Sequence, residues 1–243
     1  LLLSTSLTGL ISGFIMQKIQ KPTSKADASE PVLTTLQPEL KPVPEPVTSL
    51  FLYNTLHNIS ALLLFDVNLA SAAAENLANF VRAVTEIKKA RHTSLGEEFK
   101  AVDLYLTIEK SRLGDRLVIE KNFSRQCYEI PFPSLALFPF IDGCIRYSAE
   151  LQTNPVTVTI ACQQENNALI LELADHVQES EEETWPQASR DAVYTQLRRR
   201  LLDFYGSSAR MSRQPLQPTG ERLKITIPLA NAKIGRTGRQ EAA

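Results

Sequence analysis

The chain has 243 residues, of which 43% are hydrophobic and 22% charged, so it can bury one or two ordinary cores. Its 26 Lys and Arg are balanced by 27 Asp and Glu, which excludes the basic surplus that neutralises nucleic-acid phosphates. We therefore expect no direct nucleic-acid partner. The three cysteines, Cys127, Cys144 and Cys162, lack CxxC spacing, so we expect buried thiols in a reducing compartment and no metal site.

The first 16 residues carry no charge, and Lys18 and Lys21 follow them. Because a membrane-spanning helix needs about 20 apolar residues, we interpret residues 1–17 as the end of a transmembrane helix whose beginning is missing. The lysines then place the following region in the cytoplasm. A signal-peptide core or a buried helix is the alternative. Residues 18–48 hold six prolines and are expected to form an extended Pro-rich linker.

Residues 49–92 predict a helical hairpin. Apolar residues recur at steps of three and four from Ser49 to Phe65 and again from Leu69 to Val84, with a break at residues 66–68. Alanines in the second run permit close helix approach. Since two short helices with one apolar stripe each cannot bury it alone, we expect a dimer that forms a four-helix bundle.

Residues 93–230 predict a two-layer α/β sandwich, so the expected fold class of the whole chain is α+β. Ser94 and Glu97 have the spacing of a capping box at the start of a helix that Gly114 ends. A second helix is expected from Ser189 to Tyr205. Strand-like runs cover residues 116–123, 156–162, 168–174 and 222–229. Residues 231–243 are expected to form a disordered tail.

Two sequence blocks resemble the LytS-type family of sensor histidine kinases. Residues 51–59 read F-L-Y-N-T-L-H-N-I, similar to the family's F-L-F-N-T-L-N-S-I, and residues 95–117 are similar to its L-x-E-E-L…Y-L-x-I-E-x-x-R block. Weaker matches cover residues 131–142 and 220–229. The resemblance implies that residues 93–230 form a GHKL-type ATPase-like domain behind a dimerisation hairpin. It also implies a bacterial inner-membrane protein with this region in the cytoplasm, a response regulator as partner, and a homodimer or a heterodimer with a LytS-type kinase.

The family's phosphate-accepting histidine directly precedes F-L-F-N, and the corresponding residue here is Leu50. A leucine has no lone pair, so the family's phosphorelay step cannot occur at this position. His57 is the alternative phosphoacceptor. It lies seven residues further along the same helix, a displacement of about 10.5 Å, which is far more than phosphoryl transfer tolerates.

The motifs that hold nucleotide in the family are incomplete. Its E-N pair corresponds to Asp142 and Gly143, and glycine offers no oxygen to Mg²⁺. Arg146 matches a basic residue that meets phosphate. Asp175 matches the aspartate of the D-x-G-x-G motif, but Val177 replaces a glycine. An acidic run at residues 179–183 follows, and no glycine precedes the helix after it. We expect Asp142, Arg146 and Asp175 to be remnants of a nucleotide pocket, with no metal site.

These observations favour a signalling pseudokinase that dimerises and regulates or scaffolds a partner kinase or response regulator, without a bound cofactor. Two alternatives stay open. The chain is an active histidine kinase that uses ATP and Mg²⁺ and phosphorylates His57, or it keeps nucleotide as a structural ligand without transferring phosphate.

Overall fold

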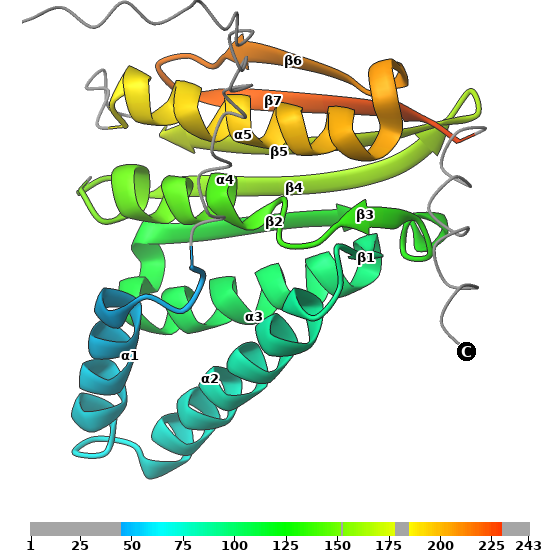
Figure 1. Ribbon diagram of the computed structural model, residues 1–243. Helices are drawn as coiled ribbons and strands as arrows, with labels where there is room; N and C mark the ends of the chain where they lie inside the picture. The colour runs from blue at the N-terminus through cyan, green and yellow to red at the C-terminus, as the bar shows by residue number, and fades with distance from the viewer. Residues whose placement is uncertain (1–44, 152, 178–184, 230–243) are drawn as a thin grey trace, which may run out of the picture. The chain divides into compact units, whose positions relative to one another are not determined.

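The computed structural model describes residues 45–151, 153–177 and 185–229. A five-stranded sheet carries helices on one face, and a helical hairpin packs against the outermost of these helices (Figure 1). The α+β class expected from the sequence is therefore confirmed. The expected transmembrane end at residues 1–17, most of the linker at 18–48 and the expected tail at 231–243 lie outside the described residues. Within the described ranges, none of the helices combines the length and hydropathy that crossing a bilayer requires.

The described residues form five α-helices: α1 Ser49–Leu62, α2 Val67–Lys88, α3 Leu95–Leu113, α4 Phe138–Gly143 and α5 Gln187–Tyr205. A π-helix, Cys144–Ala149, continues α4 directly. The predicted capping box is present, since the Ser94 and Glu97 side chains each accept from the other's backbone N–H. Gly114 ends α3, as predicted, with a φ of 59° that favours glycine. Helix α1 ends at Leu62, three residues earlier than predicted, because Asp66 caps the N-terminus of α2.

The sheet has the order β2-β4-β5-β7-β6, formed by β2 Leu117–Phe123, β4 Val156–Glu165, β5 Ala168–Val177, β7 Thr219–Pro228 and β6 Arg210–Pro215. Strands β2 and β4 are parallel, and the other neighbours are antiparallel. The four predicted strands are confirmed. The edge strand β6 was not predicted, and neither was a small antiparallel pair formed by β1 His92–Ser94 and β3 Pro131–Pro133.

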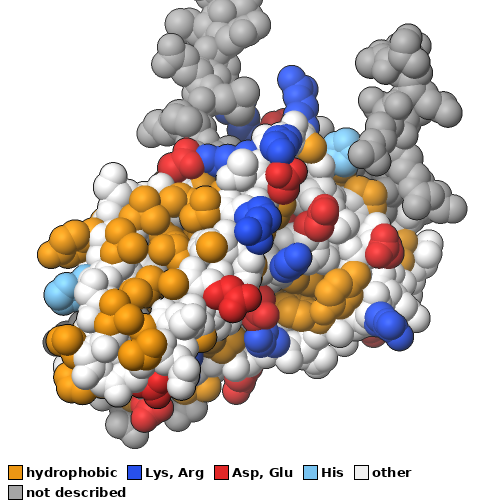
Figure 2. Space-filling model, turned by 90° about the horizontal axis from the view of Figure 1, so that it is seen from below, with side chains coloured by type: hydrophobic (Ala, Val, Ile, Leu, Met, Phe, Trp, Pro, Cys, Tyr) orange, Lys and Arg blue, Asp and Glu red, His pale blue; other side chains and the backbone are white. Residues whose placement is uncertain are grey.

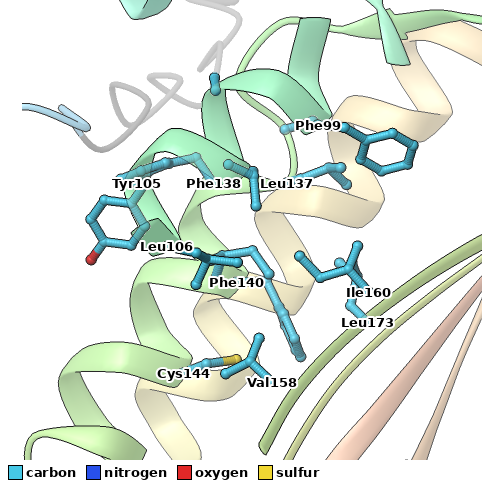
Figure 3. Packing of buried hydrophobic residues seen from close by; sticks show 14 of the residues in the cluster. Phe99, Tyr105, Leu106, Leu137, Phe138, Phe140, Cys144, Val158, Ile160 and Leu173 are labelled. Atoms are coloured by element: carbon cyan, nitrogen blue, oxygen red, sulfur yellow. The ribbon is translucent and has the colours of Figure 1, made fainter. Parts of the chain in front are cut away.

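The main core lies between the sheet and the helices that cover it. Phe140 and Cys144 extend from α4 and the π-helix toward Val158 and Ile160 of β4 (Figure 3). All three cysteines are buried free thiols, as the sequence predicts. The core thus fixes α4 and the π-helix on the sheet, and these two elements carry Asp142 and Arg146, respectively.

The hairpin buries part of its apolar surface within its own chain. Phe80 of α2 is fully buried, with its ring 5.3 Å from Phe51 of α1, 5.7 Å from Tyr105 of α3 and 6.0 Å from Phe138 of α4. This packing against α3 was not part of the prediction. Other apolar side chains of the hairpin are exposed among the described residues, and hydrophobic side chains gather where the hairpin faces the viewer (Figure 2). The exposed set comprises Leu50, Tyr53, Leu56, Leu63, Leu64, Phe65, Val67 and Leu69, here called the hairpin surface.

Candidate functional site

Helix α1 brings Leu50 to a recess that also contains two predicted site residues. The recess has a volume of about 130 Å³, and Leu50, Asp142 and Arg146 lie on its wall. Its other lining residues are Thr48, Phe51, Asn54, Tyr105, Glu109 and Glu150. Thr48 starts α1 beside this recess by accepting a hydrogen bond from the backbone N–H of Phe51 over 3.1 Å. Leu50, which the resemblance aligns with the family's phosphoacceptor, therefore lines the same recess as Asp142 and Arg146, although it is 57% exposed.

Asp142 is held by one neutral and one charged partner. The hydroxyl of Tyr105 donates to its Oδ1 over 2.9 Å, and Arg146 donates to its Oδ2 over 3.4 Å. Burial raises the pKa of the Asp142 carboxyl, whereas the hydrogen bond from Tyr105 and the charge of Arg146 oppose that rise. The Arg146 side chain is 47% exposed, so it stays in contact with solvent.

Two glutamates that line the recess share one arginine from α3. Arg112 forms ion pairs with both Glu109 and Glu150. Burial raises the pKa of Glu109, and the charge of Arg112 opposes this rise. The recess therefore presents the carboxyl groups of Glu109, Asp142 and Glu150 and the guanidinium of Arg146. Arg146 pairs with Asp142, and Arg112, which does not line the recess, pairs with the two glutamates.

Asp175 lies apart from this recess, on β5 in the interior. Ser148 of the π-helix donates to its Oδ2 over 2.8 Å, and the backbone N–H of Glu221 donates to its Oδ1 over 3.2 Å. Its exposed fraction is 1%, and this burial raises the pKa of the carboxyl. Both oxygens of Asp175 are thus engaged by the protein. The structure brings together two of the three predicted pocket residues, and the third stabilises the core.

Strand β5 continues where the family's motif has glycines. Asp175, His176 and Val177 remain in the antiparallel ladder with β7, and Val177 pairs with Thr219. Gly220 permits this close pairing, because an added Cβ would lie 2.1 Å from the carbonyl oxygen of Asp175. An extended β-branched valine fits a strand better than a turn with positive φ.

Trp185 is the site residue that sequence reasoning missed. Its exposed fraction is 1%, and its indole presses against Gly143, where an added Cβ would lie 2.2 Å from the ring. The ring stacks on Tyr147 at 5.8 Å, and it lies 5.7 Å from the ring of Phe140. The guanidinium of Arg190 lies 5.2 Å from the indole centroid. The available signal was that Trp185 is the only tryptophan of the chain and that Gly143 replaces a larger residue.

His57, the alternative phosphoacceptor, lies on α1 outside the recess. It is exposed, and its ring stacks on Tyr53 at a centroid distance of 6.2 Å. The recess reaches Leu50 and Asn54 on the same helix but does not include His57. Among residues 45–151, 153–177 and 185–229, no three His, Cys, Asp or Glu side chains cluster closely enough to hold a metal ion.

Sequence comparison with known proteins finds histidine kinases. The family model described as "Histidine kinase" matches residues 39–117. The sensor protein LytS of Oceanobacillus iheyensis is 24% identical over 242 residues, covering 95% of this chain and 39% of its own length. LytS of Staphylococcus haemolyticus is 23% identical over 70% of this chain and 31% of its own length. The sensor histidine kinase BtsS of Escherichia coli is 27% identical over 71% and 31%, respectively.

Structural comparison finds the histidine kinase domain of a blue-light-activated kinase from Erythrobacter litoralis. The two are 14% identical with a TM-score of 0.43, over 76% of this chain and 98% of that one. The catalytic domain of histidine kinase ThkA gives a TM-score of 0.41 at 8% identity, over 56% and 93% of the two chains. The chain spans about a third of the length of the curated relatives that it matches.

Proposed function

Because this chain belongs to the LytS-type family of sensor histidine kinases, we propose that it acts in two-component signalling as a pseudokinase. In this proposal it neither binds ATP productively nor accepts phosphate. It dimerises through its helical hairpin and regulates or scaffolds a partner kinase or a response regulator. The fold of the family is retained for binding, while the groups that perform the reaction are absent.

The observation that carries the proposal is the placement of Leu50. This residue lies in one recess with Asp142 and Arg146, which is where an attacking imidazole would have to meet the γ-phosphate. Nucleophilic attack requires a lone pair within about 3–3.5 Å of the reacting phosphorus. The side chain of Leu50 contains only carbon and hydrogen, so position 50 provides no atom that accepts phosphate.

The side chains that would hold ATP and Mg²⁺ do not fit that ligand. Gly143 supplies no side-chain oxygen for the metal. Asp175 is 1% exposed, and its carboxyl group already accepts hydrogen bonds from Ser148 and from the backbone N–H of Glu221. The carboxyl groups of Asp142 and Glu150 line the same recess, and in ionised form they repel a triphosphate unless a metal ion intervenes. These features support a site that does not use the family's cofactor.

The hairpin surface supports the binding half of the proposal. It includes the side chains of Leu64 and Phe65, which are 80% and 87% exposed, and apolar surface of this kind is buried when two hairpins form a four-helix bundle. We propose a second copy, or a LytS-type kinase with an equivalent hairpin, as the partner. The proposed location is the bacterial inner membrane, with this region in the cytoplasm.

Calorimetric titration of the full chain with ATP and Mg²⁺ tests the nucleotide half. We expect no binding in the micromolar range for the wild type or for Leu50→His, and no phosphorylation of Leu50→His. The second variant restores the missing imidazole alone. If Leu50→His gained phosphate from ATP, the nucleotide site would be competent and the proposal would be wrong.

Reconstitution with an active LytS-type kinase tests the regulatory half. Addition of the wild-type chain is expected to change the phosphate level of that kinase, whereas a chain carrying Phe65→Lys is expected to have less effect. A thermal shift with ATP but no phosphoprotein would instead support a structural nucleotide. Phosphorylation lost in His57→Ala would support the active kinase.

A further inference from the structure

The indole of Trp185 packs against Gly143 and is linked to Asp175 through Arg190 and Glu221. On one side it contacts Gly143 at the end of α4. On the other side it faces Arg190, whose Nε lies 3.6 Å from Glu221, and the backbone N–H of Glu221 binds Asp175. One buried ring thus contacts position 143 directly and reaches Asp175 through two intermediate residues.

The surroundings of this ring are those of a binding slot for a flat aromatic group. The Tyr147 ring is nearly parallel to the indole, with an interplanar angle of 14°, and Phe140 meets it at 53°. Arg190 provides a cation at 5.2 Å. Offset stacking, tilted aromatic contact and cation–π attraction all act on a planar π-system without fixing its polar groups.

The polar atom of the indole adds little to its fixation. Trp185 Nε1 is buried and has no hydrogen-bond partner among the described residues. A buried donor without a partner opposes burial, so the ring is held by stacking and apolar contact. Recognition in this slot thus depends on shape and aromaticity, which a free heterocycle of similar size shares.

We propose that Trp185 is an intramolecular occupant of the base-binding pocket, held in a slot that Gly143 leaves open, and that a planar aromatic heterocycle binds there once the indole is removed. This inference rests on the proposed function and names what closes the nucleotide site. Gly143 and Trp185 then form one coupled pair. Because Gly143 has no side chain, the indole fills the space that a side chain at position 143 would take.

A double-mutant cycle on the full chain tests this coupling. Gly143→Ala places a Cβ against the ring, so it is expected to lower the melting temperature of the wild type by several degrees. In a Trp185→Gly background the same substitution is expected to have almost no effect. In a Trp185→Phe background, whose ring is smaller, Gly143→Ala is expected to cause an intermediate loss of melting temperature. This second background serves as the test if Trp185→Gly does not fold. Equal losses in all backgrounds would overturn the proposal.

Binding of free indole tests the slot itself. Enclosed apolar cavities left by large-to-small substitutions bind small aromatic molecules of matching shape. Indole at ten times its dissociation constant is expected to raise the melting temperature of Trp185→Gly by about 3 °C, and adenine is the second probe. The wild type, whose slot is filled, is expected to show no shift. Absence of a shift in folded Trp185→Gly with either probe would overturn the proposal.

The wild type offers an independent readout, because Trp185 is the only tryptophan of the chain. Its fluorescence is expected to resist quenching by acrylamide and to stay unchanged when ATP is added. Strong quenching would show that the indole is not seated in the slot. These outcomes are separate from the pseudokinase proposal, since phosphate transfer by the wild type would contradict that proposal without removing indole binding by the variant.

Discussion

The hydroxyl of Tyr105 donates a hydrogen bond to Oδ1 of Asp142 over a distance of 2.9 Å. This contact joins α3 to α4, which carries Asp142, one of the residues that line the recess. Asp142 is partly buried, and its carboxylate needs this donor because burial favours the protonated form. The hydrogen bond therefore couples the position of α4 to the ionisation of Asp142, the charged residue of this helix.

Tyr105→Phe is expected to destabilise the chain by about 1–3 kcal/mol, because it removes one of the two partners of a largely buried carboxyl group. The same change raises the pKa of Asp142 further. Denaturant unfolding at pH 7 measures the first effect, and carboxyl chemical shifts over a pH series measure the second. The matched control is Tyr53→Phe, since Tyr53 is 68% exposed. Equal stability of both variants would contradict this expectation.

Glu98 ties the segment before α4 to α3. Its carboxylate accepts hydrogen bonds from the backbone N–H groups of Leu135 and Leu137, and Arg200 donates to the carbonyl oxygen of Leu135 over 3.1 Å. Burial raises the pKa of Glu98 from 4.5 to about 7, and the hydrogen bonds and the charge of Arg200 only partly oppose this rise. Between pH 4.5 and about pH 7, Glu98 is therefore mostly protonated in the folded chain and mostly ionised in the unfolded chain.

The contribution of Glu98 to stability is therefore largest below pH 4.5 and falls as the pH rises to about 7. Glu98→Gln removes this titration. Relative to that variant, the wild type is expected to lose up to roughly 3 kcal/mol between pH 4.5 and pH 7.5, measured by unfolding at several pH values. A hydrogen-bond difference between the wild type and Glu98→Gln that does not depend on pH shifts the unfolding free energy by a constant and leaves its slope against pH unchanged. A slope equal for both proteins would contradict the role assigned to Glu98.

Glu97, the residue directly before Glu98 on α3, is the control with the opposite sign. Hydrogen bonds from Thr93 and from the backbone of Ser94 lower the pKa of Glu97 below 4.5. Its contribution is present above pH 4.5 and is lost as the pH falls through its lowered pKa. Glu97→Gln is therefore expected to flatten the acid limb of the stability curve and to leave the region from pH 5 to pH 7 unchanged.

Phe80 anchors the hairpin to the rest of its chain. Its ring is fully buried among Phe51, Tyr105 and Phe138. Phe80→Ala is expected to cost about 3–5 kcal/mol because it leaves a cavity at the junction of four helices. Leu69→Ala, on the same helix but 56% exposed, is expected to cost less than about 0.5 kcal/mol in a monomer. Similar midpoints for the two variants in urea unfolding would show that the hairpin does not dock in this way.

The hairpin surface is expected to mediate self-association. Introducing Leu64→Lys and Phe65→Lys together places two charges where apolar surface would be buried, so the dissociation constant of the dimer is expected to rise at least tenfold, or about 1.4 kcal/mol. Sedimentation equilibrium measures it. The control is Leu202→Lys, a leucine that is 38% exposed on α5. Unaltered association of the double variant would place the interface elsewhere.

Elements with strong local signals were predictable from the sequence. The capping box at Ser94 and Glu97 and the glycine at 114 define α3 almost to the residue, and the apolar strands β2, β4, β5 and β7 follow from their composition. Strand β6 was missed because Arg210–Pro215 is short and polar, and it becomes a strand only through pairing with β7. Helix α4 was not predicted because its six residues are too few to show a helical period of apolar residues.

The sequence predicts the members of the candidate site that occupy motif positions, but it does not predict the contacts that each of them makes in the folded chain. Leu50, Asp142 and Arg146 lie in one recess, and the family's motif spacing anticipates this grouping. The burial of Asp175 depends on Ser148 and Glu221, which are distant in sequence and give no local signal. The role of Trp185 was likewise hidden, because it follows from contacts that only the folded chain assembles.

The central claim is that the family's fold persists here without phosphate transfer. Incubation of the pure full chain with γ-labelled ATP and Mg²⁺, followed by measurement of acid-labile phosphate on the protein, tests it most directly. A related active kinase serves as the positive control and His57→Ala as the matched variant. The account predicts background label in the wild type and in His57→Ala alike. Stable label on the wild type that disappears under acid would contradict it.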